Sequence, residues 1–558
     1  MIRLSELKLP LDHSELDLAL LIYTTLGVKA EQVSKILPFK RSFDARKASI
    51  LAVFIADVEL VSPALEIQVL HQLKGKPHIA PAPDMRYPLP YQAPLDLPIR
   101  PVVVGFGPCG IFAALVLAQM GFKPIVLERG TTVRQRTKDT WDLWRKNNLH
   151  AESNVQFGEG GAGTFSDGKL YSQIKDPRFL GRKVMNEFVK AGAPADILLD
   201  SHPHIGTFKL VKVVENLRQQ IIDLGGEIRF PQRVTDIVLS KNSNNTTGHA
   251  QKISGLVVWD ALNQRSYELA AEHVVMALGH SSRDTFTMLH ERGVHLLAKP
   301  FSIGFRLEHP QGVIDKARWG RHAGHKALGA AEYRLVHHAS NGRAVYSFCM
   351  CPGGTVVAAT SEPERVVTNG MSQYSRNERN ANAGIVVGIQ PEDFTTERQA
   401  DGSVSPLAGM AFQRQLESHA YVLGGKTYEA PGQKVVDFLK NEASHTLGSV
   451  IPSYKPGVKL TNLASALPDY AITAIREAIP AFGKQIKGFD MDDAIFTGVE
   501  TRTSSPLSIP RGLDFQSVNT KGLYPAGEGG GFAGGILSAG VDGIKVAEAL
   551  AQQILNPT

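Results

Sequence analysis

The sequence predicts an α/β protein in which a discontinuous α/β domain carries an inserted, mixed α+β domain and follows a small N-terminal α+β module. Three observations support this fold class. Prolines concentrate between residues 77 and 101, a strand, glycine-rich turn and helix follow directly, and a second strand, glycine cluster and helix close the chain. The expected parts are the N-terminal module at 1–76, a linker at 77–100, the first part of the discontinuous domain at 101–298, the inserted domain at 299–491 and the second part at 492–558.

Composition is that of an ordinary globular protein. The 558 residues are 43% hydrophobic and 20% charged, which is enough to build two to four domains with their own cores. The formal net charge is +6, but Lys and Arg are spread along the chain rather than gathered in runs. A solvated, mildly basic surface is therefore favoured over a nucleic-acid-binding surface.

Cysteine content and the N-terminus both point to a cytoplasmic, soluble protein. With only three cysteines the chain has no disulfide framework, so a reducing compartment is expected. The first residues interrupt every apolar run with charge, unlike a secretory signal. No uncharged apolar stretch reaches the roughly 18 residues that a membrane-spanning helix needs.

The N-terminal module is expected to contain a strand at 3–11, a helix at 19–28 and a second strand at 48–61, from the alternation and spacing of apolar residues. Eight of the 32 prolines of the chain then fall between Pro77 and Pro101. Proline fixes φ and removes a backbone donor, so this segment should be an extended linker.

A βαβ nucleotide-binding motif follows the linker. The strand 102–104 leads into Gly105, Gly107 and Gly110, a helix of small residues comes next, and a second strand ends in Glu128. The first glycine permits a tight turn, the second lets the backbone approach a diphosphate, and the third lets the helix press against the sheet. The acid about twenty residues later can accept hydrogen bonds from ribose hydroxyls, which argues against a 2′-phosphate.

The end of the chain favours a flavin over a nicotinamide dinucleotide. Residues 523–528 read as a short apolar strand ending in Gly527 and Glu528, followed by glycines and a helix over 535–550. An acid at this strand end can hold ribityl hydroxyls. The helix N-terminus offers N–H groups to the side of a flavin that gains negative charge on reduction. Together the two motifs predict a Rossmann-like FAD-binding domain with non-covalently bound FAD.

These residues resemble the FAD-binding fold shared by glutathione-reductase-like flavoproteins. The turn at 274–279 is similar to that fold's A-T-G signature, with Leu278 in place of Thr, and Val234 matches the strand that meets the adenine. The blocks 158–170, 348–357 and 497–507 resemble a narrower family of uncharacterised FAD-dependent dehydrogenases.

The resemblance implies that the glycine-rich loop from Gly160 to Thr164 lines the FAD diphosphate or the flavin. Consecutive small residues can form an anion-binding nest, although a plain mobile loop is the alternative. The full set of expected cofactor contacts is Gly105, Gly107, Pro108, Cys109, Gly110, Glu128, Arg129, Gly160, Gly161, Ala162, Gly163, Thr164, Val234, Ala277, Gly279, Gly527, Glu528, Gly534, Gly535 and Ile536.

Two familiar mechanisms are not supported by the sequence. No C-x-x-x-x-C pair follows the first βαβ unit, and Cys109 is most simply a small buried residue of the turn. No second G-x-G-x-x-G string is present, so NAD(P)H is expected at most as a transient co-substrate. No metal site is expected.

Candidate catalytic residues are Cys349, Cys351, Arg306, Lys169, Glu500 and Arg502. The two cysteines alternate along a predicted strand, so both thiols should share one face. They can be core residues, a strained redox pair or soft metal ligands, although C-x-C alone is a poor zinc signal. The charged residues can anchor a substrate carboxylate or form ordinary ion pairs. His202 and His204 can act as acid or base, or simply belong to a surface turn.

The sequence thus predicts an FAD-dependent oxidoreductase of the dehydrogenase type, which moves a hydride or electrons between an organic substrate and bound FAD. Two alternatives stay open. One is a flavin-dependent RNA-modifying enzyme that uses the N-terminal module to recruit RNA, and the other is a non-catalytic flavin sensor or scaffold. The small-molecule substrate and the oligomeric state are left open by the sequence.

Overall fold

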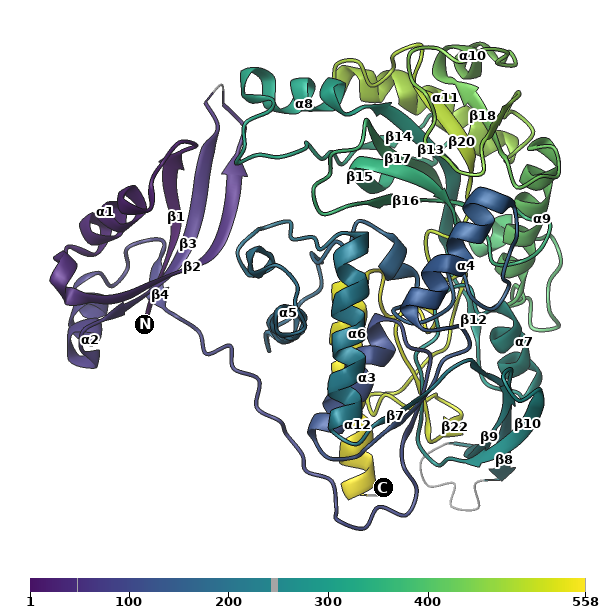
Figure 1. Cartoon of the computed structure of the whole chain (residues 1–558), viewed down its shortest axis with the longest axis horizontal. Helices are drawn as coiled ribbons and strands as arrows, with labels where there is room; N and C mark the ends of the chain where they lie inside the picture. Colours follow the sequence, from purple (N-terminus) through teal and green to yellow (C-terminus); the bar gives the residue numbers. More distant parts are fainter. Residues whose placement is uncertain (48, 242–248, 557–558) are drawn as a thin grey trace.

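A computed structural model describes residues 1–47, 49–241 and 249–556. A small module stands beside a large body, and one long extended segment connects the two (Figure 1). The body has a lower part that contains both the first βαβ unit and the C-terminus, and an upper part built around a large sheet. Among the described residues, none of the helices is long and apolar enough to cross a bilayer.

The N-terminal module is a four-stranded antiparallel sheet in the order β2-β3-β1-β4, with α1 and α2 on one face. Both helices lie on the side away from the body (Figure 1), and their apolar residues form a separate core with the sheet. Helix α1 starts with a capping box between Ser14 and Asp17 and ends at Gly27 in the left-handed conformation. The bounds are β1 Ile2–Pro10, α1 Glu15–Leu26, β2 Val33–Asp44, β3 Leu51–Leu60, α2 Pro63–Gln72 and β4 Ile79–Pro81.

The module contains elements that the sequence pattern did not predict. Strand β2 lacks a clean apolar alternation because it is an edge strand, and α2 begins at the Ser62–Pro63 signal. Strand β4 pairs with β1, so it lies inside the range expected as linker. Position 48, the start of the strand expected at 48–61, lies outside the described residues.

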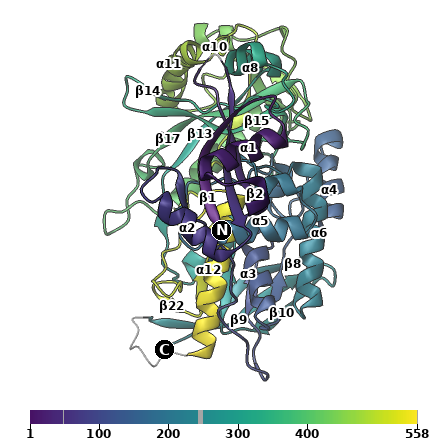
Figure 2. The ribbon, with the colours of Figure 1, turned by 90° about the vertical axis from the view of Figure 1, so that its left-hand side faces the viewer.

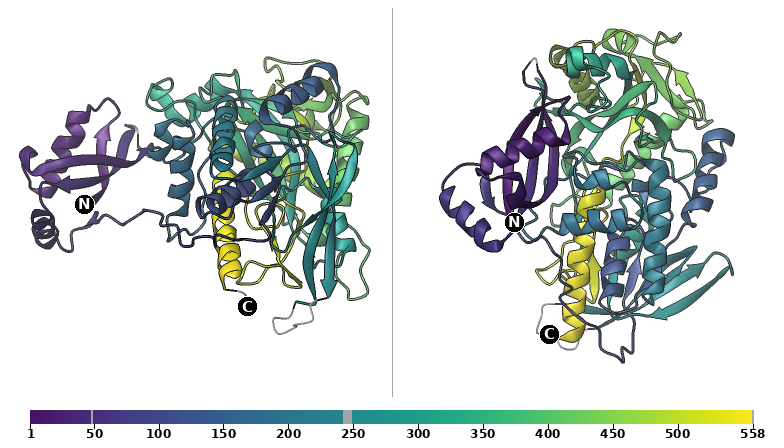
Figure 3. Two further views of the ribbon diagram at one scale, coloured as in Figure 1. Left: turned by 60° about the horizontal axis from the view of Figure 1, so that its bottom comes forward. Right: turned by 60° about the vertical axis from the view of Figure 1, so that its left-hand side comes forward.

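The edge of the module docks onto the body, which Figure 2 shows from the module's side. The Arg41 N–H donates to Leu199 O at 2.6 Å, and the Ser201 N–H donates to Arg41 O at 2.9 Å. The connecting segment 82–100 has neither helix nor strand and runs from the module along the body (Figure 3). It is held there by the Ala93 N–H, which donates to Met120 O at 2.8 Å.

The lower part of the body is centred on a five-stranded parallel sheet assembled from distant segments. Its order is β23-β11-β5-β6-β7, so the last strand of the chain joins the same sheet as the first βαβ unit. The bounds are β5 Val102–Val104, β6 Ile125–Leu127, β7 Glu227–Arg229, β11 Val274–Met276 and β23 Leu523–Pro525.

Helices α3 and α12 pack against this sheet and against each other (Figure 1). A Cβ atom at Gly543 of α12 would lie 2.3 Å from Cys109 O of α3, so the two backbones are in direct contact. Nearly all of α3 is buried, which explains its uniformly apolar sequence. The helices of this part are α3 Pro108–Gln119, α4 Val133–Lys146, α5 Leu180–Lys190, α6 Thr207–Asp223, α7 Arg283–Glu291 and α12 Ile536–Leu555.

A second, smaller sheet flanks the parallel one. Three of its strands follow one another in the chain, and a short strand from near the C-terminus joins them. Its members are β8 Gln232–Lys241, β9 Gln251–Asp260, β10 Arg265–Ala270 and β22 Thr520–Lys521; β12 Leu297–Ala298 and β21 Leu507–Ser508 form a separate pair.

The upper part is an eight-stranded mixed sheet covered by helices. Its path is β14-β15-β17-β13-β20-β18-β19, and β16 pairs with β15. The strands are β13 Phe301–Pro310, β14 Val336–His338, β15 Ala344–Ala358, β16 Thr368–Ser372, β17 Asn380–Ile389, β18 Ala430–Lys434, β19 Val458–Leu460 and β20 Ile495–Glu500. The helices are α8 Gln311–Trp319, α9 Ala408–Leu423, α10 Val435–Lys440 and α11 Asp469–Gln485.

Strand β20 lies within 492–558, which the sequence analysis assigns to the second part of the discontinuous domain. The structure instead places it inside the upper sheet, between β13 and β18. Every residue of β20 is buried, because an interior strand is covered on both faces. The chain therefore leaves the upper sheet after Glu500 rather than at residue 491.

Candidate functional site

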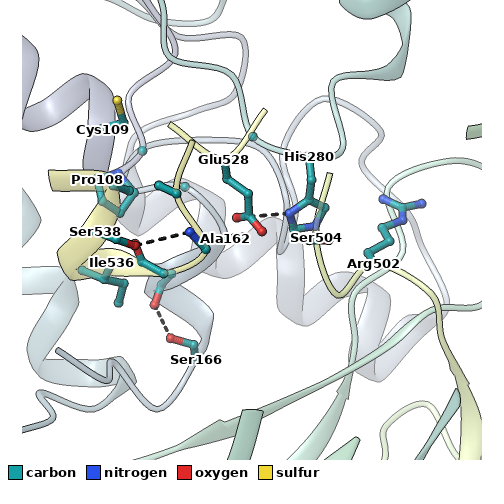
Figure 4. Close-up of a pocket in the computed structure, with 18 of the residues that line it drawn as sticks. Pro108, Cys109, Ala162, Ser166, His280, Arg502, Ser504, Glu528, Ile536 and Ser538 are labelled. Carbon is teal, nitrogen blue, oxygen red and sulfur yellow. Dashed lines mark hydrogen bonds and ion pairs between the residues drawn. The ribbon is translucent and has the colours of Figure 1, made fainter. Parts of the chain in front are cut away.

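A cavity of about 1280 Å³ lies between the two parts of the body. Its walls come from the turn after β5, the segment after β11, the start of α12 and the strand β15 of the upper sheet. Figure 4 shows Pro108 and Cys109 of α3 on the same side of this cavity as Ile536 and Ser538 of α12. The two motifs that predict FAD binding, which include α3 and α12, thus lie at the same cavity.

Three glycine-rich stretches touch one another at this wall. A Cβ atom at Gly527 would lie 2.9 Å from Cys109 Cβ, and one at Gly163 would lie 2.9 Å from Ile536 Cγ1. Gly161 has φ +63°, and a Cβ there would lie 2.8 Å from Gly107 Cα. Side chains at these positions would push the stretches apart, so the wall depends on glycine.

Helices α3 and α12 both direct an N-terminus toward the cavity. Their N-cap residues are Gly107 and Gly535, both of which line the cavity, and neither N-cap makes a side-chain capping hydrogen bond. The first N–H groups of a helix have no partner within the helix, and they carry the positive end of its dipole. One cavity therefore has two positive helix ends with backbone donors, which suits a diphosphate and an electron-rich ring edge.

The tight turn between β5 and α3 depends on two further glycines. Gly105 has φ +96°, and a Cβ there would lie 2.6 Å from Ala277 O. A Cβ at Gly110 would lie 2.0 Å from Gly105 O. Gly110 does not line the cavity; its role is to let α3 approach the turn.

Glu128 has a structural role that its sequence position does not reveal. Its Oε2 accepts from the Phe106 N–H at 2.9 Å, and its Oε1 accepts from the Gly130 N–H at 2.8 Å and the Gly158 N–H at 3.0 Å. A carboxylate offers about four acceptor positions. Glu128 therefore fixes the surrounding backbone and keeps about one acceptor position at the cavity wall, where Val234 also lies.

A buried arginine that sequence reasoning missed holds the glycine-rich loop. Arg136 of α4 has no exposed surface, and burial lowers its pKa to about 10. Its guanidinium donates at 2.7–3.2 Å to five carbonyl oxygens between Asn154 and Gly161, which fixes the segment that leads into the loop. The acceptors are Asn154, Val155, Gly158, Glu159 and Gly161.

Most of the sequence-predicted cofactor contacts line this cavity. Those that do are Gly105, Gly107, Pro108, Cys109, Glu128, Arg129, Gly161, Ala162, Gly163, Val234, Ala277, Gly279, Glu528, Gly534, Gly535 and Ile536. Gly110, Gly160, Thr164 and Gly527 do not line it.

Comparison with known proteins shows the family of this chain. An uncharacterized protein from Clostridium beijerinckii is 45% identical over 559 residues, and the match covers 100% of this chain and 99% of that protein. The chain belongs to the same family as that protein. Residues 300–503 match the family model described as FAD-dependent protein, C-terminal domain-like, and residues 1–59 match a domain of unknown function. The family match suggests FAD as the cofactor.

Solved structures give only a distant likeness. The glycerol-3-phosphate dehydrogenase from Bacillus halodurans complexed with FAD is 12% identical, with a TM-score of 0.33, over 82% of this chain and 65% of that one. The 3-ketosteroid-delta4-(5alpha)-dehydrogenase from Rhodococcus jostii is 12% identical, with a TM-score of 0.35, over 83% of this chain and 100% of that one. These scores are too low for individual site residues to be compared.

His280 and Glu528 form a pair at the cavity wall. The Nδ1 of His280 lies 3.3 Å from Glu528 Oε2, and the two side chains point toward one another in Figure 4. Neither ring nitrogen of His280 makes a well-directed hydrogen bond, although both are buried. His280 is not among the residues predicted from the sequence. Its place directly after Gly279, a predicted cofactor contact, could have indicated a position at the site.

Two of the charged candidates form a buried ion pair. Arg306 Nε lies 2.8 Å from Glu500 Oε2, and both side chains are almost fully buried. Although burial opposes the charge of Arg306, the neighbouring Glu500 raises the pKa of the guanidinium. Glu500 lines the cavity and Arg306 does not. For Arg306 the structure supports the ion-pair alternative.

Arg502 lines the cavity, but its guanidinium is committed to protein groups. It donates to both carboxylate oxygens of Glu417 at 3.0 and 2.8 Å, and also to the hydroxyls of Ser281 and Ser361. Arg283 of α7 binds the other side of Glu417 at 2.7 Å. This buried cluster joins the lower part of the body to α9 of the upper part.

The histidines of the turn near residue 203 do not line the cavity. Burial lowers the pKa of His204, which stacks on Tyr374 and lies 3.0 Å from Tyr374 O. His202 stacks on Tyr171, which does reach the cavity. The surface-turn interpretation fits His202, which is exposed, whereas His204 is half-buried beside Tyr374.

The cysteines occupy three different environments. Cys109 is buried, and burial raises the pKa of its thiol, as expected for a small residue packed in the turn. Cys349 is half-buried and lines the cavity, while Cys351 is fully buried behind it. Within the described residues, no group of three or more His, Cys, Asp or Glu side chains is arranged to hold a metal ion.

Proposed function

We propose that the chain binds FAD non-covalently in this cavity and acts as an FAD-dependent oxidoreductase on a small organic substrate. The observation that carries the proposal is the convergence of two glycine-capped helix N-termini, α3 and α12, on one cavity. The match of residues 300–503 to an FAD-dependent family supports the choice of dinucleotide.

The cavity wall offers a residue set for each part of the cofactor. Glu128 and Val234 would hold the adenosine, and the N-terminus of α3 with Gly161 would hold the diphosphate. Glu528 would hold the ribityl chain, and the N-terminus of α12 would stabilise negative charge on the flavin. Bound FAD would supply the two-electron chemistry, while the protein supplies binding and electrostatics.

The upper sheet closes the other side of the cavity. Tyr346, Phe348 and Met350 of β15 contribute to this wall, and their apolar surface excludes water. Pockets for drug-sized ligands measure roughly 300–1,000 Å³. A cavity of about 1280 Å³ exceeds this range, as a ligand the size of a dinucleotide requires. The substrate would enter between the cofactor and β15.

An anaerobic screen of flavin bleaching tests the oxidoreductase proposal. The flavin-bound protein is mixed with NADH, NADPH and a panel of metabolites, and its visible absorption is followed. Bleaching by a metabolite alone identifies a dehydrogenase or oxidase, and bleaching by a nicotinamide identifies a reductase that uses NAD(P)H as a transient co-substrate. A bound flavin that none of these donors reduces contradicts the proposal.

A further inference from the structure

Cys349 occupies an irregular point of β15 at the cavity wall. The register between β15 and β17 shifts between Phe348 and Cys351, so the strand bulges at Cys349 and Met350. Cys349 has φ +43°, in the left-handed region that residues other than glycine seldom adopt. Bulges and such backbone conformations concentrate at functional sites, where they re-aim a side chain.

The sequence predicts a regular strand with both thiols on one face, but the strand bulges between them. Cys349 lines the cavity, whereas Cys351 has no exposed surface and does not line it. The Cys351 thiol also donates to Cys349 O at 3.4 Å. In a regular strand the two Cα atoms would lie about 6.6–6.8 Å apart, at the upper limit for a disulfide. The bulge at Cys349 and Met350 departs from this regular spacing.

Cations surround this pair of thiols. Arg306 Nη1 donates to Cys349 O at 2.8 Å, and Lys169 Nζ donates to Met350 O between the two cysteines. The acids that face the group are Glu500, paired with Arg306, and Asp167 and Glu332 near Lys169. The neighbouring Cys351 thiol lowers the pKa of Cys349 against the effect of burial, and the positive charges of Arg306 and Lys169 lower it further. The pKa of Cys351 is raised.

We propose that Cys349 and Cys351 form a redox-active dithiol, with Cys349 as the attacking thiolate, and that its substrate is a low-molecular-weight disulfide entering the cavity. The Cys349 thiolate attacks one substrate sulfur, which forms a mixed disulfide and releases the first substrate thiolate. The Cys351 sulfur, on losing its proton to solvent, then attacks Cys349 Sγ and releases the second. Two electrons pass from the protein dithiol to the substrate, which takes up two protons and leaves as two thiols.

This inference stands on the chain's own thiols, so it succeeds or fails separately from FAD binding. A yellow protein whose Cys349 is unreactive overturns the dithiol alone. A colourless protein whose Cys349 is reactive overturns the FAD proposal alone.

The first test is alkylation of the purified protein, as isolated, by iodoacetamide across pH, with each cysteine followed by peptide mass spectrometry. Cys349 should react fastest, with a midpoint below pH 7, compared with about 8.5 for an ordinary thiol. Cys109 in the same sample is the internal control and should stay unlabelled, because it is buried with a raised pKa. A Cys349 midpoint near 8.5, or labelling no faster than that of Cys109, overturns the proposal.

The second test is treatment with oxidised glutathione, followed by mass analysis. The wild-type chain should lose two hydrogens and form an internal Cys349–Cys351 disulfide, whereas Cys351→Ser should retain one glutathionyl group on Cys349. Lys169→Met should raise the pH midpoint of Cys349 alkylation, a shift that a purely structural lysine would not cause. Absence of the internal disulfide in the wild-type chain contradicts the proposal, whatever the variants do.

Discussion

Gly110, near the start of α3, is the most sterically constrained of the glycines predicted to contact the cofactor. A Cβ at Gly110 would lie 2.0 Å from a backbone oxygen. We therefore expect Gly110→Ala to lower the free energy of unfolding by about 1–3 kcal/mol, as overpacking does, and to reduce bound flavin. Thermal unfolding and the ratio of visible to ultraviolet absorption measure both effects.

Gly312 of α8 provides the matched control, since a Cβ there meets nothing within 4 Å. Gly312→Ala should leave the flavin content unchanged and stabilise the helix by up to about 1 kcal/mol. Equal losses of flavin in the two variants would show that the turn has no special steric requirement.

At the level of single residues, sequence spacing predicts a position when the local motif requires one residue type there. Gly105, Gly107 and the acid at 128 belong to this class. Arg136 and His280 could not be found in that way, because their roles depend on carbonyl groups and a carboxylate brought near only by folding. The hydrogen bonds of Glu128 to backbone N–H groups were hidden for the same reason.

The contact between α7 and α9 depends on Glu417, which binds Arg283 and Arg502 with no exposed surface of its own. Glu417→Gln would leave the buried guanidinium of Arg502 without a carboxylate and that of Arg283 with Glu362 as its remaining carboxylate. We expect a loss of about 3–5 kcal/mol in unfolding free energy, measured by chemical denaturation. Glu291→Gln, at an exposed position of α7, should change it by less than about 0.5 kcal/mol. Similar values for the two variants would contradict this role of the cluster.

Glu362 belongs to the same cluster, because Arg283 Nη1 lies 2.6 Å from its Oε2, and it predicts that stability depends on pH. Although burial opposes its ionisation, Glu362 has its pKa lowered from 4.5 to about 2 by Arg414 and Arg283. A lowered folded-state pKa stabilises the protein above the unfolded value, and this contribution is lost as pH falls through the folded value. The difference in melting temperature between wild type and Glu362→Gln should thus be full at pH 7 and shrink between pH 4.5 and 2. A difference that stays constant across this range would contradict the assignment.

At the level of elements, local patterns predicted the strands and helices of the first and last motifs, because β5, α3, β23 and α12 are apolar and bounded by glycine turns. The sheet to which β20 belongs was not predicted. Its apolar run fits any buried strand, and only pairing with β13, nearly two hundred residues earlier, assigns it to the upper sheet. Strand β2 was missed because an edge strand lacks a strong apolar signal.

For the whole molecule, a cavity shared by both chain ends should couple cofactor binding to global stability. Ligand that binds only the folded state adds about 2.7 kcal/mol at a hundred times its Kd. FAD added to flavin-stripped protein should therefore raise the melting temperature. FMN should raise it less, since it lacks the adenosine that Glu128 and Val234 would hold. Equal shifts from FAD and FMN would contradict the proposed adenosine site.

We propose that the stretches around residues 107 and 530 bind one and the same FAD molecule. The most direct test is to denature the purified protein with heat or acid and quantify the released flavin by chromatography. We expect a yellow protein that releases intact FAD, one molecule per chain. A colourless protein that rejects added FAD would contradict it.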